Sequence, residues 1–338
     1  MRRKFFSEAA TVHVRRKLFS DAAAVYMKMM HFLVWTGMHV RNKIFYDTEK
    51  EIKMKKKCMA ILTAFTMACS LAACGGSSAP TAPAEETEIQ VFIAASLNTV
   101  MQEVAAAYNK QHPEVKITYN ADSSGTLLTQ IEEGYACDVF FSAAQKQMDK
   151  LEKEDKLVVE GTRANVVNNQ VVVVSRKDSG TKVTGLADIA NAASIALADG
   201  SVPVGRYTRV AMINSGLLQG YDVDAAADIS TQQVSDALGG VEISEQGNVS
   251  KVLAAVVEAS CEVGTTYYSD TYGYEDELDV LETISYDLTG DVIYPIAQVV
   301  NEEADDAEKA AAADFVKFVA GDESKAIFEA YYFDTNVE

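Results

Sequence analysis

The sequence predicts an α/β fold in which mostly parallel sheets are flanked by helices, and two observations support this. At 338 residues the chain exceeds one typical domain, and its hydrophobic content of 48% supplies enough apolar surface for packed cores. From Gln90 onward, strand-like runs alternate with helix-like runs, which is the order expected of βαβ units. We therefore expect two α/β lobes or one large domain.

The elements follow one another in a regular order. Strand-like runs at 90–95, 115–120 and 138–143 each precede a helix-like pattern. Four consecutive valines, 171–174, then indicate a strand that is buried on both faces. Further helix and strand patterns lead to a returning strand at 291–300, and two helices close the chain.

Small or polar residues mark four expected helix N-termini. These are Ser96, Ser124 with Ser123 before it, Pro203, and Asn248. Each helix start offers unpaired N–H groups and the positive end of the helix dipole, a combination that binds anions. Serine and asparagine are also ordinary helix caps that bind no ligand, so the pattern alone leaves both interpretations open.

The distribution of charge excludes several functional classes. Residues 1–57 carry 14 Lys and Arg against 5 Asp and Glu, which leaves 16 against 44 for residues 58–338. This acidic part lacks the clustered basic residues that nucleic-acid binding needs. His112 is the one histidine beyond residue 57, and the chain has no G-x-S-x-G or P-loop lysine motif, so we expect no enzyme and no metal cation site.

The N-terminal part has the features of an export signal. Residues 54–74 begin with lysines, continue with an apolar stretch and end in "LAAC", which resembles a lipobox whose Cys74 becomes the lipidated first residue. Residues 75–87 are a Ser, Pro and Ala-rich tether. Residues 1–53 are interpreted as a spurious or uncharacterised extension, with a membrane segment around 22–40 as the alternative.

Two cysteines, Cys137 and Cys261, lie in the globular part. Because they stand in separate regions, they are a weak disulfide signal even in an exported protein. We expect buried free thiols.

Several segments together resemble a known family. They are "VFIAASL" at 91–97, "SSGTLLTQIEEGYACDVFFSAAQKQMDKL" from Ser123, and then "VPVGRY", "GNVSKVL" and "VGTTYYSD" in the same order and spacing. The chain thereby resembles the molybdate-binding proteins of ABC importers, within the type II solute-binding superfamily, from Glu88 to Phe333. The resemblance implies a two-lobed fold with a two-stranded hinge: lobe I from 88–170 and 286–338, and lobe II from 171–285.

The resemblance also implies a set of ligand-binding residues. The family's two serine hydroxyls fall on Ser96 and Ser124, and its two main-chain amide donors fall on Val204 and Val249. The tyrosine hydroxyl that completes the donor set falls on Tyr267.

Three neighbouring residues carry separate expectations. Gly125 stands where the family often has a third serine. Arg206 follows the third loop, where we expect an exposed salt bridge, with shielding of the anion's charge as the alternative. Of the pair Tyr267 and Tyr268, we expect Tyr268 to be the packing residue.

The implied function is capture of molybdate or tungstate by uncharged donors, with no cofactor and with release to an ABC permease. The protein is expected to be a monomer, extracytoplasmic and held to the membrane by lipid on Cys74. The alternative is binding of another anion, such as sulfate, thiosulfate or a small organic anion.

Overall fold

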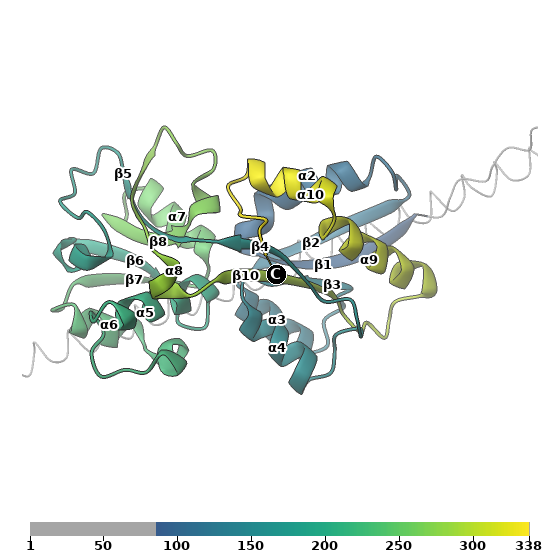
Figure 1. Cartoon of the computed structure of the whole chain (residues 1–338), viewed down its shortest axis with the longest axis horizontal. Helices are drawn as coiled ribbons and strands as arrows, with labels where there is room; N and C mark the ends of the chain where they lie inside the picture. Colours follow the sequence, from purple (N-terminus) through teal and green to yellow (C-terminus); the bar gives the residue numbers. More distant parts are fainter. Residues whose placement is uncertain (1–85, 338) are drawn as a thin grey trace, which may run out of the picture. The chain divides into compact units, whose positions relative to one another are not determined.

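The computed structural model describes residues 86–337, which form two lobes, each built on a five-stranded sheet (Figure 1). The predicted extension 1–53, the signal peptide 54–74 with Cys74, and the tether 75–87 up to residue 85 lie outside the described residues. Within the described range, no helix is both long and apolar enough to cross a membrane.

The sheet of lobe I has the order β2-β1-β3-β10-β4. Four of its strands run in the same direction, and β10 is inserted antiparallel between β3 and β4. The strands are β1 (Thr87–Ala94), β2 (Val115–Asp122), β3 (Val139–Phe141), β4 (Ala164–Asn169) and β10 (Val292–Gln298).

Helices cover both faces of this sheet, with α2, α9 and α10 on one face and α3 and α4 on the other (Figure 1). Because side chains alternate along a strand, Ile89, Val91 and Ile93 belong to one hydrophobic core, while Phe92 and Phe140 belong to another. The helical elements are η1 (Ala95–Leu97), α2 (Asn98–Tyr108), α3 (Ser124–Glu132), α4 (Gln145–Asp149), the π-helical turn η2 (Lys150–Glu154), α9 (Asp306–Val319) and α10 (Asp322–Ala330).

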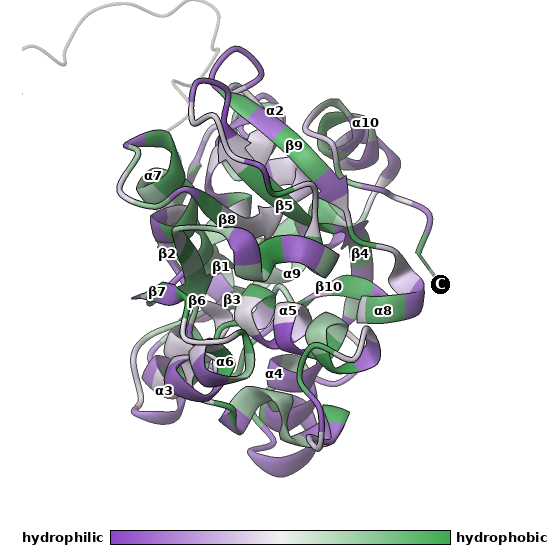
Figure 2. Cartoon of the chain, turned by 90° about the vertical axis from the view of Figure 1, so that its left-hand side faces the viewer, coloured by the Kyte–Doolittle hydropathy of each residue, from purple (hydrophilic) through white to green (hydrophobic). Residues whose placement is uncertain are grey.

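Lobe II repeats this plan with the order β7-β6-β8-β5-β9, in which β5 is the reversed strand. Its strands are β5 (Val171–Arg176), β6 (Ser194–Ala198), β7 (Glu242–Gln246), β8 (Val263–Tyr267) and β9 (Leu278–Thr283). Its helical elements are η3 (Leu186–Asn191), α5 (Pro203–Asn214), η4 (Val223–Asp228), α6 (Thr231–Ala237), α7 (Val249–Val257), η5 (Tyr268–Thr271) and α8 (Tyr286–Thr289). Figure 2 shows the hydrophobic residues concentrated in the central strands and the hydrophilic ones in the outer loops.

The chain passes between the two sheets twice, once at Gln170 and once between β9 and β10. Close to the first crossing, the C-terminal tail pairs with β4 through mutual backbone hydrogen bonds between Asn168 and Asp334. The short α8 is tied to lobe II, because Asn214 Nδ2 donates to the Leu288 carbonyl at 2.8 Å.

The predicted α/β class with two lobes and mostly parallel sheets is confirmed. The four valines of β5 are fully buried, as their sequence indicated, and Cys137 and Cys261 are buried free thiols. The strands β4, β7 and β9 were not predicted. All three lie at sheet edges, and polar residues interrupt the apolar run in each of them.

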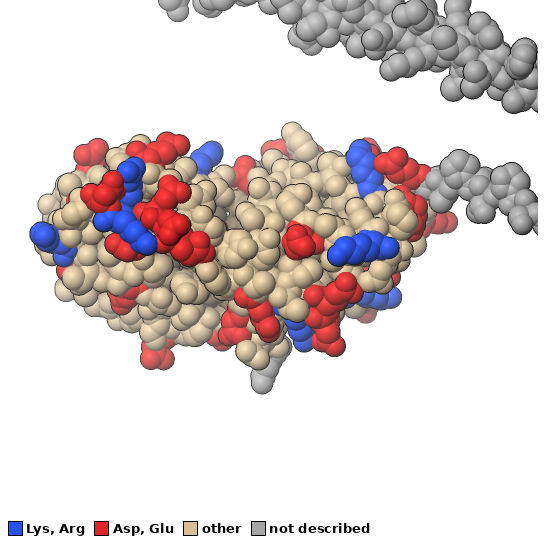
Figure 3. Space-filling model, turned by 90° about the horizontal axis from the view of Figure 1, so that it is seen from above, with Lys and Arg blue, Asp and Glu red and all other residues tan. Residues whose placement is uncertain are grey.

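The surface agrees with the acidic composition. Asp and Glu side chains cover more of the face drawn in Figure 3 than Lys and Arg side chains do. Any anion that approaches this protein therefore meets a surface that is negative on balance.

Candidate functional site

A small cavity lies between the two lobes, where the N-terminal ends of helices from both sheets converge. Its volume is about 10 Å³, far below the roughly 300–1,000 Å³ of pockets for organic ligands. Within the described part of the chain, no charged side chain lines it. The lining residues are Ala94, Ala95, Ser96, Ser123, Ser124, Ala143, Val202, Pro203, Val204, Val249 and Tyr267.

The structure brings together all five residues expected from the sequence. Ser96 and Ser124 line the cavity from lobe I, and Val204, Val249 and Tyr267 line it from lobe II. These positions are 171 residues apart at most in the chain, yet they border one space. The arrangement therefore depends on how the two lobes meet.

Ser124 is the first residue of α3, and its hydroxyl is fully buried. The helix start is capped by Ser123, whose Oγ accepts a hydrogen bond from the Thr126 amide at 3.1 Å. The Ser124 Oγ itself accepts from the Ala143 amide at 2.9 Å. Because that bond uses a lone pair, the Ser124 hydroxyl proton stays free to be donated to a guest.

Ser96, in η1, is held by a comparable arrangement. Its Oγ lies 2.9 Å from the hydroxyl of Tyr294, a fully buried residue of β10. The Tyr294 hydroxyl also accepts from Asn169 Nδ2 at 3.2 Å. When Tyr294 donates its proton to Ser96, the proton of Ser96 is left for a guest.

Val204 lies in the first turn of α5. Pro203 occupies the first helical position, where its missing N–H costs nothing. Gly205 lets the turn approach β6, because a Cβ there would lie 2.1 Å from the Asp199 carbonyl oxygen and 2.5 Å from that of Ala198. Among the described residues, the Val204 amide has no hydrogen-bond acceptor.

Val249 opens α7, and its amide likewise has no acceptor in the described part of the chain. The cap of this helix is Asn248, whose Oδ1 accepts from the Lys251 amide at 3.0 Å. The other end of the same side chain crosses to lobe I, where Asn248 Nδ2 donates to Asp122 Oδ1 at 3.0 Å. One residue thus caps a site helix and joins the two lobes.

Tyr267 ends β8 and is 1% exposed. Its hydroxyl has no hydrogen-bond partner among the described residues, which is unusual for a buried polar group. Burial raises the pKa of Tyr267 well above its usual value, so the hydroxyl keeps its proton. The arrangement leaves a buried donor at the cavity wall.

Two expectations about neighbouring side chains were wrong. Tyr268, which we expected to pack in the interior, is 38% exposed and lies beside the ring of Tyr332. Tyr267 is the buried residue of the pair. The alternation of side chains along β8 and into η5 sends the two rings to opposite sides. Arg206 forms no exposed salt bridge with a described residue; it is half-buried beside the Tyr207 ring, and its Nε has no partner there.

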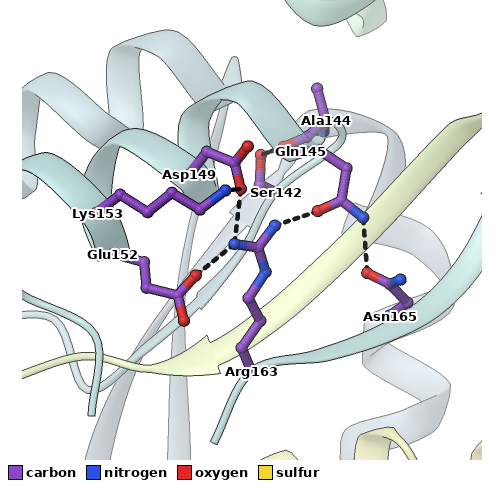
Figure 4. A network of polar contacts seen from close by, with 8 residues as sticks. All are labelled: Ser142, Ala144, Gln145, Asp149, Glu152, Lys153, Arg163 and Asn165. Carbon is purple, nitrogen blue, oxygen red and sulfur yellow. Dashed lines mark hydrogen bonds and ion pairs between the residues drawn. The ribbon is translucent and has the colours of Figure 1, made fainter. Parts of the chain in front are cut away.

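The loop that supplies Ala143 is fixed by a polar network (Figure 4). Arg163 bonds to Asp149 and Glu152 on the helical segment that follows the loop, and to Gln145 at its start. Gln145 Nε2 in turn donates to Asn165 of β4 at 2.7 Å. This network ties α4 to the sheet edge and thereby holds the amide that orients Ser124.

Sequence reasoning missed the residues that orient the donors. Tyr294 and Asn169 act on Ser96 from distant strands, and Asp122 meets Asn248 across the lobes. A local pattern gives no signal for such contacts, although Tyr294 lies in the returning strand expected at 291–300.

A larger cavity of about 320 Å³ lies next to the first, and Ser96 lines both. Its wall includes Glu258 and Asp270. Two carboxylates disfavour the binding of an anion there, so the small cavity is the better candidate for an anion.

Most of the described chain matches a family model and several known proteins. The family model described as "Bacterial extracellular solute-binding protein" matches residues 89–334. The chain is 31% identical to the molybdate-binding protein ModA of Escherichia coli over 257 residues, which cover 74% of this chain and 90% of that protein. It is 28% identical to ModA of Haemophilus influenzae, with 81% and 99% covered. A further relative is the Bacillus subtilis lipoprotein YvgL, named as an ABC transporter substrate-binding protein, at 26% identity with 83% and 99% covered.

Solved structures give a consistent result. A substrate-binding domain named for a molybdenum ABC transporter of Clostridium difficile has a TM-score of 0.54 and 30% identity, with 74% of this chain and 99% of that chain covered. The periplasmic molybdate-binding protein of Azotobacter vinelandii has a TM-score of 0.58 at 18% identity, with 72% and 98% covered, which shows the shared fold alone. From the extent of the family match, the chain belongs to the bacterial extracellular solute-binding proteins.

Proposed function

We propose that this protein binds molybdate or tungstate between its lobes and delivers the ion to an ABC permease. One observation carries the proposal: hydroxyl and amide donors from both lobes border one small cavity that no described charged side chain lines. Such donors hold a dianion without adding charge to the protein.

The chemistry of the donors favours an ion that carries no proton. Molybdate and tungstate at neutral pH present four acceptor oxygens, which suit a shell made only of donors. Phosphate at this pH usually retains a proton, and that proton would face another donor. Each unpaired buried group costs about 1–3 kcal/mol, so phosphate binds more weakly.

Sulfate also lacks a proton, so the hydrogen-bonding pattern does not reject it. Its shorter bonds make it the smaller tetrahedron, and only the size of the closed cavity distinguishes it from molybdate. The relatives named as molybdate-binding proteins favour molybdate over sulfate or thiosulfate.

The two lobes supply separate donors, so the ion stabilises the conformation in which both sets meet. We infer that the permease recognises this closed form. Lipid on Cys74 keeps the protein, as a monomer, on the outer side of the membrane, next to the permease. The Bacillus subtilis relative, which is named as a lipoprotein, supports the lipid anchor.

Isothermal titration of the purified protein against molybdate, tungstate, sulfate, thiosulfate and phosphate tests the proposal. We expect molybdate and tungstate to bind at least about tenfold more tightly than phosphate. Preferential binding of sulfate or thiosulfate would assign the alternative ligand. Absence of binding to all five anions would refute the site.

A further inference from the structure

One buried charge next to the candidate site has no part in the donor set. Arg209 lies on α5 and is 0% exposed. Its Nε donates to the Ile229 carbonyl at 2.7 Å, and its Nη1 donates to the carbonyls of Ala198 at 2.8 Å and Gly205 at 2.9 Å. All three acceptors are neutral. No described carboxylate forms an ion pair with Arg209, and its Nη2 has no partner within the described range.

These contacts place the guanidinium directly behind the N-terminal turn of α5. Gly205, one of its acceptors, follows Val204, whose amide borders the cavity. Ala198, another acceptor, is the last residue of β6, against which this turn is packed. Arg209 thus joins the helix start to the end of the strand and puts a positive charge close to the cavity without lining it.

Such a charge is costly for the protein itself. A buried ion without an opposite charge loses its hydration, and carbonyl dipoles replace only part of it. Burial lowers the pKa of Arg209 to about 10, which still leaves it protonated at neutral pH. The carboxylates of Asp199 and Glu245 act on it only through space, and Asp199 Oδ1 is already bonded to Ser201. An anion bound in the cavity would supply the missing opposite charge and offset this desolvation cost.

We propose that Arg209 is a positioning residue that also gives the site its preference for doubly charged oxyanions. The uncharged donors contact the ion and select its tetrahedral shape, while Arg209 attracts its negative charge from behind α5. This inference rests on the proposed function. It predicts that loss of the charge weakens a dianion more than a monoanion of the same shape.

Perrhenate is the suitable probe, because it is a tetrahedral oxyanion close to tungstate in size but with a single negative charge. We expect Arg209→Gln to weaken tungstate binding roughly 30-fold and perrhenate binding roughly fivefold, since a charge interaction scales with the charge of the guest. Arg209→Lys keeps the charge and loses the fork of donors, so it should retain most of the wild-type ratio between the two affinities.

Arg176→Gln is the matched control. Arg176 is an arginine of the same lobe, but it is partly exposed, paired with Asp178 and bonded to the Val257 carbonyl at the far end of α7, so we expect both affinities to change less than about twofold. Arg209→Met replaces the glutamine variant if that variant does not fold, as judged by circular dichroism. If neither neutral variant folds, the lysine variant decides: a retained ratio supports the inference and a lost ratio contradicts it.

Two results would overturn the inference. If the neutral variant weakened tungstate binding and perrhenate binding equally, the role of Arg209 would be structural only. If neither affinity changed, Arg209 would have no role in anion binding. Failure of the wild-type protein to bind any of these anions would instead contradict the proposed function, so the two failures are distinguishable.

Discussion

The two lobes follow the same plan but offer a guest different kinds of donor. Lobe I presents the side-chain hydroxyls of Ser96 and Ser124, each oriented by a further hydrogen bond. Lobe II presents main-chain amides at Val204 and Val249, together with the hydroxyl of Tyr267. Lobe I thus depends on side-chain identity, whereas lobe II depends mainly on where its helices begin.

This difference determines how each half of the site can be damaged. Substitution removes a hydroxyl from lobe I directly. A main-chain amide remains with any side chain except proline, so, apart from the Tyr267 hydroxyl, lobe II is damaged by displacing a helix start.

The largest effect is expected at Gly205, which lets α5 approach β6. Alanine there would place a Cβ 2.1 Å from a carbonyl oxygen, so the helix start must shift. We expect Gly205→Ala to lower the free energy of unfolding by about 3 kcal/mol and to abolish measurable anion binding.

Denaturant unfolding and calorimetric titration check this prediction. Gly247→Ala is the control, because a Cβ at Gly247 would meet only the end of the Lys251 side chain, 3.7 Å away. A Gly205→Ala variant with wild-type stability and affinity would contradict the account of lobe II.

The contrast between donor types is tested at the cavity wall. Ser124→Ala and Tyr267→Phe should each weaken molybdate binding by about 1.5–3 kcal/mol, the range for hydrogen bonds to a charged group. Val249→Ala keeps its amide and should change affinity by no more than about threefold, whatever it does to stability. Isothermal titration measures all three, and unchanged affinity in both hydroxyl variants would refute the assigned donors.

The bond between the lobes should affect the lifetime of the complex. Asn248→Ser retains a side chain that can cap α7 but no longer reaches Asp122. Loss of one hydrogen bond of about 1 kcal/mol should raise the dissociation rate constant roughly fivefold and leave the association rate constant nearly unchanged. Stopped-flow measurements separate the two, and a change confined to association would argue against this role.

The smallest effect concerns Asp270, which accepts hydrogen bonds from the Thr266 hydroxyl and the Tyr267 amide. Burial raises its pKa to about 6, above the roughly 3.9 of an unfolded chain. The folded protein therefore binds the extra proton, and this contribution to stability is lost as pH rises from about 4 to about 6.

We expect a loss of about 1 kcal/mol over that interval, because partial contact with solvent reduces the effect. Asp270→Asn should remove this slope from the unfolding free energy measured against pH. An identical slope in wild type and variant would assign the dependence to other groups.

Much of this arrangement could be predicted from the sequence, because it depends on local features. The valines of β5 and the capping residues at Ser123 and Asn248 act on their own segments. The family resemblance then selected five of the cavity-lining residues, four near helix starts and Tyr267 at the end of a strand. Contacts between distant segments gave no such signal.

The misses share one physical cause, since they depend on what lies opposite a residue in space. Tyr294 orients Ser96 from a strand about 200 residues further along the chain. Arg209 has the sequence context of an ordinary surface arginine of a helix and is nevertheless fully buried. Tyr267 is buried and Tyr268 is exposed because β8 ends at Tyr267. The end of a strand is its least predictable property.

Binding of the ion by uncharged donors of both lobes is tested by a crystal structure of the molybdate complex, with the metal located by its anomalous signal. We expect the ion to lie in the small cavity, where its oxygens accept hydrogen bonds from Ser96, Ser124, Val204, Val249 and Tyr267. A carboxylate or a cationic side chain in direct contact with the ion, or an ion bound by one lobe alone, would contradict it.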